Sequence, residues 1–138
     1  MSQHKAVLLL GSNLGNRKKN LEIAIEKLLI NDVNVLKRSK FLISSPVEFD
    51  SSNNFCNIAV IIFTKLSPVQ LLHKIKEIEV EMGRKNDTKV IGNYEDRIID
   101  IDIVSYDNLS FISNSLEIPH KKHLFEREFS KIILKGFN

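Results

Sequence analysis

The chain has 138 residues, of which 43% are hydrophobic and 27% are charged, as in a globular protein, and we expect one domain over residues 1–138. No apolar run reaches the roughly 20 residues that span a bilayer, and the N-terminus MSQHK lacks a signal-peptide pattern, so we expect a cytoplasmic protein without membrane contact. The single Cys56 excludes an internal disulfide, and the net charge of +3 comes without a basic stripe among aromatic residues, which argues against nucleic acid as a partner.

The first third of the chain predicts a strand, a helix and a second strand. Residues 5–11, KAVLLLG, form an apolar run that ends in a Gly-Ser-Asn turn, as in a short buried strand. This turn lacks the Gly-Lys-Ser/Thr of a P-loop, so alone it indicates a strand-to-helix connection. Helical spacing of apolar residues predicts a helix that ends near Ile30. Partial alternation over residues 33–44 predicts one continuous strand, followed by a polar loop.

The middle of the chain predicts a second strand and helix. Residues 55–64, FCNIAVIIFT, read as a strongly apolar strand. Ser67 suits the N-cap of the next helix, Pro68 suits its first turn, and Gln70 completes a capping box. An apolar stripe follows at helical spacing, and Gly83 is placed to end this helix.

The last third contains a polar segment, a strand and an extension. The polar residues 84–97 lead to a strand over residues 98–104. Residues 109–112 predict a short edge strand, and a terminal helix is expected to begin near Lys122. The resulting order is β-α-β-β-α-β plus an extension. It predicts an α+β fold, a ferredoxin-like sandwich with helices packed on an antiparallel sheet.

Two carboxylates interrupt the predicted strand at residues 98–104. Side chains alternate along a strand, so Asp100 and Asp102 point to one face while the neighbouring isoleucines point to the core. Two unpaired carboxylates this close repel each other, and a hard divalent cation such as Mg²⁺ removes that repulsion. Aspartate is depleted in strands, which favours a metal site over the alternative, an exposed sheet face where both carboxylates meet solvent.

Further charged residues are expected near the two aspartates. Arg97 precedes their strand, Arg84 begins the polar segment, and Glu79 lies in the last turns of the preceding helix. His120 and Arg127 belong to the extension. Arginines, a histidine and Mg²⁺ are the parts of a polyphosphate site, where catalysis consists mainly of positioning and charge neutralisation.

Five motifs in order carry a resemblance to a known family. They are GSNLG near the start, FCN in the third strand, IEVEMGR at a helix end, DRIIDIDI, and IPH followed by Arg-x-Phe. Together they cover almost the whole chain and resemble the 6-hydroxymethyl-7,8-dihydropterin pyrophosphokinases of folate biosynthesis. The resemblance implies a ferredoxin-like fold, two Mg²⁺ ions, and transfer of the β,γ-pyrophosphoryl unit of ATP to the pterin hydroxymethyl group with release of AMP.

The resemblance also implies roles for particular residues. Asp100 and Asp102 resemble the metal ligands that bridge to the triphosphate, and Arg84 and Arg97 complete the implied catalytic group. Asn57 resembles the side chain that reads the polar edge of the pterin, beside two phenylalanines that sandwich its ring. The implied pterin-binding residues are Ser45, Pro46, Val47, Phe55, Asn57 and Phe129, and the implied ATP-binding residues are Glu79, Arg84, Arg97, His120 and Arg127.

Several of these residues have a purely structural alternative. Phe55 and Phe129 also suit a hydrophobic core, and Glu79 also suits a surface ion pair with Lys76 or Lys85. The histidines outside the implied site are interpreted as solvated: His4, His73 and His123.

The sequence departs from the family pattern at three places. Lys76 stands where the family usually has glutamine. The segment between Arg84 and Arg97 is longer, and GNYEDR replaces a Trp-Gly-Pro-Arg run. Arg127 comes one residue later after the Pro-His pair than the family pattern places it, so we expect a local adjustment of the chain there.

Two other functions fit parts of the sequence. A binding module that holds nucleotide or pterin without turnover is consistent with the altered segment between Arg84 and Arg97. Another Mg²⁺-dependent nucleotidyltransferase on a ferredoxin-like sheet explains the two aspartates, but not Asn57 with its two phenylalanines. We therefore expect a monomeric enzyme whose partners are ATP and 6-hydroxymethyl-7,8-dihydropterin.

Overall fold

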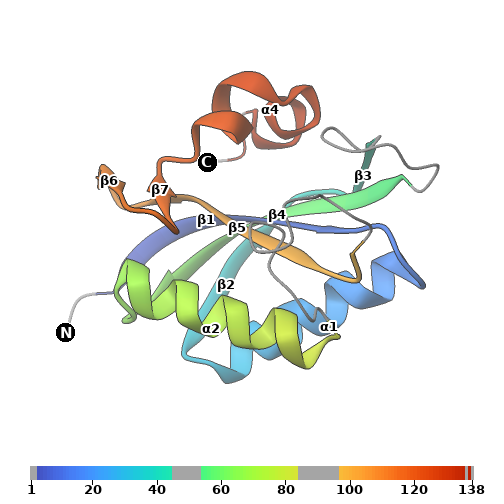
Figure 1. Ribbon diagram of the computed structural model, residues 1–138, viewed down its shortest axis with the longest axis horizontal. Coiled ribbons are helices and arrows are strands. Elements are labelled where there is room, and N and C mark those ends of the chain that lie inside the picture. The colour runs from blue at the N-terminus through green and yellow to red at the C-terminus, as the bar shows by residue number, and fades with distance from the viewer. Residues whose placement is uncertain (1–2, 45–53, 84–96, 136, 138) are drawn as a thin grey trace.

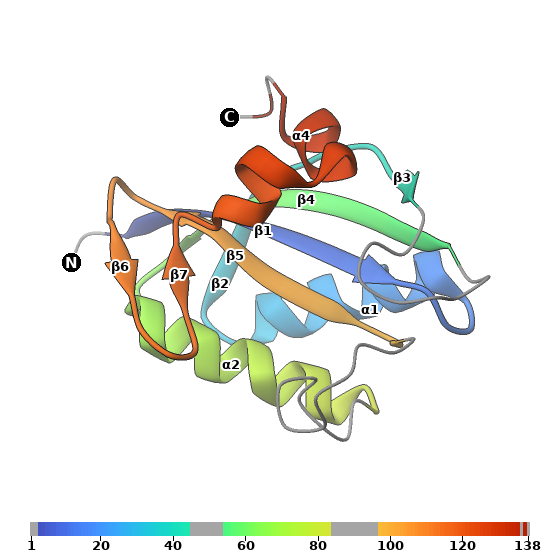
Figure 2. The ribbon, with the colours of Figure 1, turned by 45° about the horizontal axis from the view of Figure 1, so that its top comes forward.

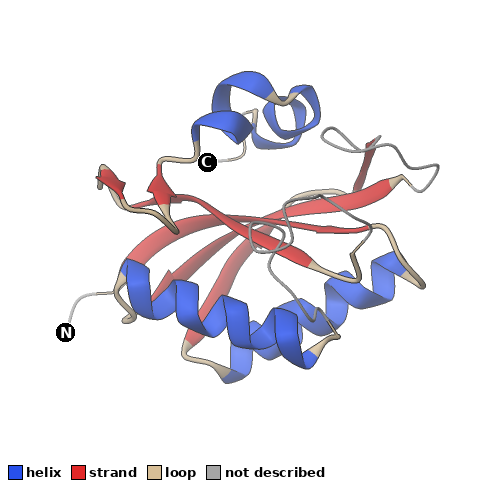
Figure 3. Cartoon of the chain, viewed as in Figure 1, coloured by secondary structure: helices blue, strands red, loops and turns tan. Residues whose placement is uncertain are grey.

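The structure is a computed structural model and describes residues 3–44, 54–83, 97–135 and 137. A central sheet is covered on one face by two helices and on the other by the C-terminal helical turns (Figure 1, Figure 3). The elements are β1 (His4–Ser12), α1 (Arg17–Ile30), β2 (Val33–Arg38), β3 (Leu42–Ser44), β4 (Phe55–Thr64), α2 (Pro68–Glu81), β5 (Asp100–Tyr106), β6 (Phe111–Ile112), β7 (Glu117–Ile118), the π-helical turn η1 (Lys122–Glu126) and α4 (Glu128–Leu134).

The main sheet has the strand order β2-β4-β1-β5, and every neighbouring pair is antiparallel. The short strand β3 also pairs with β4, beyond the end of β2. The chain passes through α1 between β1 and β2 and through α2 between β4 and β5, and both helices lie on the same face (Figure 1). This arrangement confirms the predicted ferredoxin-like order.

Both crossover helices begin at the caps that the sequence provides. The side chain of Asn16 accepts a hydrogen bond from the backbone N–H of Lys19 at the start of α1. At the start of α2, Ser67 and Gln70 form the predicted capping box. Gly83 follows the end of α2 with a φ of 108°, a conformation that glycine adopts without strain.

The central strands are buried on both faces, which explains their continuous apolar runs. One core lies between the sheet and the two crossover helices and includes Leu8, Leu10, Ile58, Ile101 and Ile103. A smaller core lies on the opposite face, where α4 packs over β1 and β4 (Figure 2). Its buried members are Val7, Leu9, Ala59, Ile61, Val104, Ile133 and Phe137.

The predicted continuous strand over residues 33–44 is wrong. The strand β2 ends at Arg38 after a register shift between Val35 and Lys37, and pairing with β4 resumes only at Leu42. At the break, the backbone N–H of Ser39 donates to the Ala59 carbonyl, and the Ser39 hydroxyl accepts from the Ala59 N–H. A side chain thus replaces one backbone partner, which ends the regular ladder.

Smaller differences concern the ends of the later elements. The aspartate-bearing strand covers residues 100–106 rather than 98–104, and the edge strand predicted over 109–112 is reduced to residues 111–112, paired with β7. The terminal helical region does begin at Lys122, but as a π-helical turn. Within the described residues, no helix combines the length and the apolar character that crossing a membrane requires.

Candidate active site

Gly11 lies at the centre of the candidate site, although sequence reasoning assigned it only to a turn. It is paired with Asn57 on β4 and with Asp100 on β5. Directly paired residues share a face of the sheet, so these three positions face the C-terminal layer. A Cβ atom at Gly11 would lie 3.0 Å from Asn57 Oδ1 and 3.3 Å from Phe55 Cδ1. Glycine therefore keeps the sheet surface open between the predicted pterin-binding and metal-binding residues.

Asp100 and Arg97 form an ion pair at the start of β5. Arg97 Nη1 lies 3.2 Å from Asp100 Oδ2, and the guanidinium is nearly buried, whereas the carboxylate is about a quarter exposed. The backbone of Arg97 is fixed by the turn after β1, because its N–H donates to Asn13 Oδ1 and its carbonyl accepts from the Asn13 N–H. The first predicted metal ligand thus already has a cationic neighbour.

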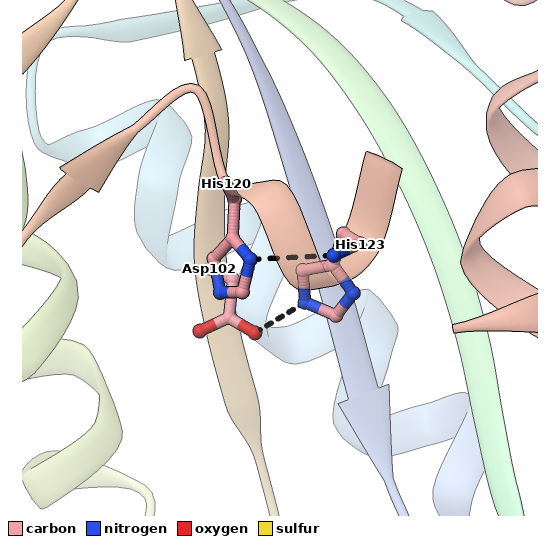
Figure 4. A group of neighbouring side chains, drawn as sticks. All are labelled: Asp102, His120 and His123. Carbon is pink, nitrogen blue, oxygen red and sulfur yellow. Dashed lines mark hydrogen bonds and ion pairs between the residues drawn. The ribbon is translucent and has the colours of Figure 1, made fainter. Parts of the chain in front are cut away.

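Asp102, two residues along β5, is held by a histidine from the C-terminal layer (Figure 4). His123 Nε2 lies 2.7 Å from Asp102 Oδ2, and His123 Nδ1 lies 2.6 Å from Ser130 Oγ. The interpretation of His123 as solvated is wrong, because only 2% of its surface is exposed. The π-helical turn places this side chain between β5 and α4, where both ring nitrogens have partners.

The electrostatic environment of Asp102 favours its ionised form. Burial alone raises the pKa of this carboxyl. The hydrogen bond with His123 and the electrostatic interactions with His123, His120 and Arg127 lower it by more, so the net pKa of Asp102 lies well below the ordinary value. Asp102 is therefore a carboxylate at neutral pH, as a metal ligand must be.

His120 lies next to His123 above the middle of β5. Its backbone N–H donates to the Val104 carbonyl, and the centroids of the two imidazole rings lie 4.2 Å apart. Burial is the main cause that lowers the pKa of His120, against the opposing charge of Asp102. Its neutral form, which can ligate a metal or accept a hydrogen bond, is favoured.

The π-helical turn explains how Arg127 reaches the site despite its shifted position in the sequence. The backbone N–H of Arg127 donates to the Lys122 carbonyl at 2.8 Å, five residues back. A π turn contains one more residue than an α turn, so it absorbs a single extra residue without displacing the next element of the chain. The local adjustment expected from the sequence is confirmed, and the charge of Arg127 acts on Asp102.

Asn57 is buried beside Gly11 and also anchors β3. Its Nδ2 donates to the Leu42 carbonyl at 2.9 Å and to Ser44 Oγ at 2.8 Å. Phe55 is partly buried on the same face of β4. Phe55 and Asn57 thus lie together on one sheet face, and Asn57 has protein partners where the sequence suggested a ligand as its main partner.

Glu79 takes a different place from the one expected for a surface residue. The ion pair with Lys76 is present, with Lys76 Nζ 3.6 Å from Glu79 Oε1, but Glu79 is only 2% exposed, so its expected place on the surface is wrong. Lys85 lies outside the described residues. Its Oε2 accepts a hydrogen bond from the backbone N–H of Ile101, whose side chain belongs to the helix-covered core. Glu79 thereby fixes β5 between the two aspartates, from the face opposite Asn57.

Some predicted site residues cannot be placed. The pterin-binding positions Ser45, Pro46 and Val47, and Arg84 of the catalytic group, lie outside the described residues. Phe129 belongs to α4, but its side chain is likewise not described. The described part of the site thus joins Phe55, Asn57, Arg97, Asp100, Asp102, His120 and Arg127, to which the structure adds Gly11, His123 and Ser130. The His120-x-x-His123 spacing was the one sequence signal for His123.

Comparison with known proteins identifies the family. A family model described as 7,8-dihydro-6-hydroxymethylpterin-pyrophosphokinase (HPPK) matches residues 7–137. The 2-amino-4-hydroxy-6-hydroxymethyldihydropteridine pyrophosphokinase of Porphyromonas gingivalis is 37% identical over 128 residues, which cover 92% of this chain and 86% of that protein. A folic acid synthesis protein of Pneumocystis carinii is 45% identical over 120 residues, which cover 87% of this chain but 16% of that protein.

Solved structures agree with the fold. An HPPK-DHPS in complex with substrates has a TM-score of 0.65 at 17% identity, over 98% of this chain and 40% of that one. The HPPK-DHPS of Plasmodium falciparum with pterin and p-hydrobenzoate has a TM-score of 0.62 at 16% identity, over 97% of this chain and 40% of that one. The chain spans only 16% to 25% of three folate-synthesis relatives. From the sequence matches, the chain belongs to the 7,8-dihydro-6-hydroxymethylpterin-pyrophosphokinase family.

Proposed function

We propose that this chain transfers pyrophosphate from ATP to 6-hydroxymethyl-7,8-dihydropterin and releases AMP, a step of folate biosynthesis. The observation that carries the proposal is the position of Gly11, which separates Asn57 and Phe55 from Asp100 on one sheet face. An open surface with a polar amide on one side and carboxylates on the other suits a flat heterocycle beside a phosphate chain. The match of the family over residues 7–137 supports this assignment.

The pterin half of the proposed site is formed by β4 and α4. Phe55 supplies one aromatic face, and Phe129 is proposed as its counterpart because α4 lies over this side of the sheet (Figure 2). Asn57 offers its Oδ1 to the ring edge as a hydrogen-bond acceptor, because both hydrogens of its Nδ2 are donated to the Leu42 carbonyl and Ser44 Oγ. Its Nδ2 bonds to β3 orient the amide, so that the binding group is held in place before the ligand arrives.

The phosphate half is formed by β5 and the C-terminal layer. Arg97, His120 and Arg127 are proposed to contact the triphosphate, and Arg84 is proposed to join them. The positive charges of the arginines and the hydrogen-bonding groups of all four side chains neutralise and orient an anionic chain, which is the main requirement of phosphoryl transfer. Glu79 supports this half by fixing β5.

The carboxylate pair fits the two Mg²⁺ ions that we propose as cofactors. Asp100 and Asp102 offer hard oxygen ligands on one face, both carboxylates are partly exposed, and each lies against a positively charged or imidazole group. When bound, Mg²⁺ supplies charge neutralisation to the phosphate oxygens. The protein contributes the alignment, through the paired strands β1 and β5 that hold the two carboxylates beside Gly11.

The decisive experiment incubates the pure protein with ATP, Mg²⁺ and 6-hydroxymethyl-7,8-dihydropterin and identifies the nucleotide product. Pterin-dependent AMP supports the proposal, and ADP contradicts it. Asp100→Ala should reduce turnover by at least about 10²-fold, the loss expected for one electrostatic stabiliser, while the protein stays folded. Binding of both substrates without any AMP would instead favour the binding-module alternative.

A further inference from the structure

Three side chains that could hold a metal ion meet above the middle of β5 (Figure 4). Asp102 comes from β5, whereas His120 and His123 come from the start of the C-terminal layer. One potential ligand atom from each lies within 4.8 Å of the others, and His123 Nε2 is 2.7 Å from Asp102 Oδ2. A carboxylate and two imidazoles form a different donor set from the all-oxygen pair of Asp100 and Asp102.

The surrounding contacts orient these groups as a metal site requires. Ser130 Oγ lies 2.6 Å from His123 Nδ1, which fixes the ring with Nε2 toward Asp102. A ligating histidine usually has its second nitrogen bonded to such an outer partner. The backbone N–H of His120 is fixed on the Val104 carbonyl. The ring of His120 is held by its Nδ1, which accepts a hydrogen bond from the backbone N–H of His123 at 3.4 Å. Asp102 is thus held by β5, His120 by contacts with β5 and η1, and His123 by Ser130 on α4.

We propose that Asp102, His120 and His123 bind a Zn²⁺-class transition-metal ion in the protein without nucleotide. Imidazole nitrogen favours such ions over Mg²⁺, and three protein ligands leave one tetrahedral position for water or a phosphate oxygen. Tetrahedral bonds of about 2.0–2.2 Å place ligand atoms about 3.3–3.5 Å apart, so the ion would move His123 Nε2 slightly away from Asp102 Oδ2, which now lie 2.7 Å apart.

The proposed ion would share only one ligand with the proposed Mg²⁺ site. Asp100 lies against Arg97 and takes no part in the cluster. His123 belongs to the π-helical turn η1, which directs its ring toward Asp102. The inference does not depend on the proposed pyrophosphoryl transfer, because it concerns the protein without substrates.

The test titrates Co²⁺, a spectroscopic substitute for Zn²⁺, into the metal-free protein without a histidine tag. We expect one Co²⁺ per chain with the intense visible absorption of a tetrahedral site, displaced by stoichiometric Zn²⁺ but not by millimolar Mg²⁺. His120→Gln and His123→Gln should each weaken Co²⁺ binding at least tenfold. Ser130→Ala should weaken it by about 10- to 100-fold, as for other outer partners of ligating histidines.

Two matched variants separate this site from other sources of binding. Asp100→Asn should leave Co²⁺ binding unchanged, and so should His73→Gln, which removes an exposed histidine on α2. Absence of the tetrahedral spectrum would overturn the proposal, as would Co²⁺ binding that survives His120→Gln or is lost in Asp100→Asn. Circular dichroism checks the fold of each variant. If His123→Gln unfolds the chain, His120→Gln decides, because that side chain is partly exposed.

Discussion

Gly11 shows how a single missing side chain can define a binding surface. The neighbouring residues on its face of β1, Val7 and Leu9, fill the smaller core. Gly11 has no side chain to continue this row, and the position that its Cβ atom would take lies next to Asn57 Oδ1 and the Phe55 ring. The requirement at this position is therefore for free space.

Gly11→Ala should reduce pterin affinity because the new Cβ atom would crowd Asn57 Oδ1 and Phe55. We expect at least about tenfold weaker binding, or roughly 1.4 kcal/mol, in calorimetric titration with the pterin, and a smaller effect on ATP. Gly15→Ala is the matched control. Gly15 has a φ of 66° and an open surrounding, so alanine there should cost about 1–2 kcal/mol of stability but leave pterin binding unchanged. If Gly11→Ala binds the pterin as tightly as the parent protein does, the pterin pocket does not lie beside Gly11.

Asp107, directly after β5, forms a pH-dependent contact with His4 and Lys5 at the start of β1. Its carboxylate is bonded to His4 Nδ1 at 2.7 Å and to the backbone N–H of Lys5 at 2.9 Å. The bond with His4 is the main cause that lowers the pKa of Asp107, and the bond with Lys5 adds to it. Because the folded pKa is lower than the unfolded one, this contribution to stability is present above the unfolded pKa, about 4, and is lost as the pH falls through the folded pKa.

Asp107→Asn should therefore lower the thermal midpoint at pH 6 and have a diminishing effect as the pH falls below about 4. Asparagine also tolerates the left-handed backbone of this residue, whose φ is 48°, so the change isolates the charge. Thermal unfolding followed from pH 2 to 7 measures the difference. The same substitution in a His4→Ala background should have a smaller effect. If the thermal midpoints of Asp107→Asn and the parent differ by the same amount at every pH, the loss of stability comes from the backbone conformation and not from the charge.

At the scale of elements, the strand β5 was the most predictable part of the site. Alternation alone placed Asp100 and Asp102 on one face and the isoleucines on the other, and both statements hold. The same local rules missed the break after Arg38, because it depends on the contact of the Ser39 hydroxyl with Ala59 on β4. They also missed the burial of His123, since a π-helical turn and a partner on α4 determine where that ring lies.

Substitutions of Glu79 can separate its predicted role in ATP binding from its structural role, the hydrogen bond between α2 and β5. Its Oε2 accepts the backbone N–H of Ile101, and a glutamine side chain can make the same hydrogen bond. Glu79→Gln should keep stability close to that of the parent, whereas Glu79→Ala should cost about 1–3 kcal/mol because a buried N–H loses its acceptor. Denaturant unfolding and ATP titration of both variants provide the measurement. A marked loss of ATP affinity in a fully stable Glu79→Gln would support the ATP-binding role predicted from the sequence.

At the scale of the whole molecule, the sheet separates a large structural layer from a small functional one. The crossover helices cover one face with the larger core. The other face carries Asn57, Asp100 and Asp102, and among the described residues it is covered by the smaller core beneath α4. The apolar side chains described in the layer that holds His120, His123 and Arg127, and that pack in this core, are Leu124, Ile133, Leu134 and Phe137. Segments with little buried apolar surface open locally at lower free energy than the core.

Ile133→Ala should loosen this layer without unfolding the sheet. Ile133 is buried against β1 and β4, and truncation of a buried isoleucine costs about 2–5 kcal/mol, with the lower end expected at this peripheral position. Hydrogen exchange should accelerate in η1 and α4 but not in β1, and Co²⁺ binding should weaken because Ser130 on α4 no longer holds His123. Ile132→Ala is the control, since that neighbouring side chain is 57% exposed and should change neither property. Faster exchange throughout the sheet would show instead that both layers unfold as one unit, in which case the C-terminal layer could not rearrange independently around its ligands.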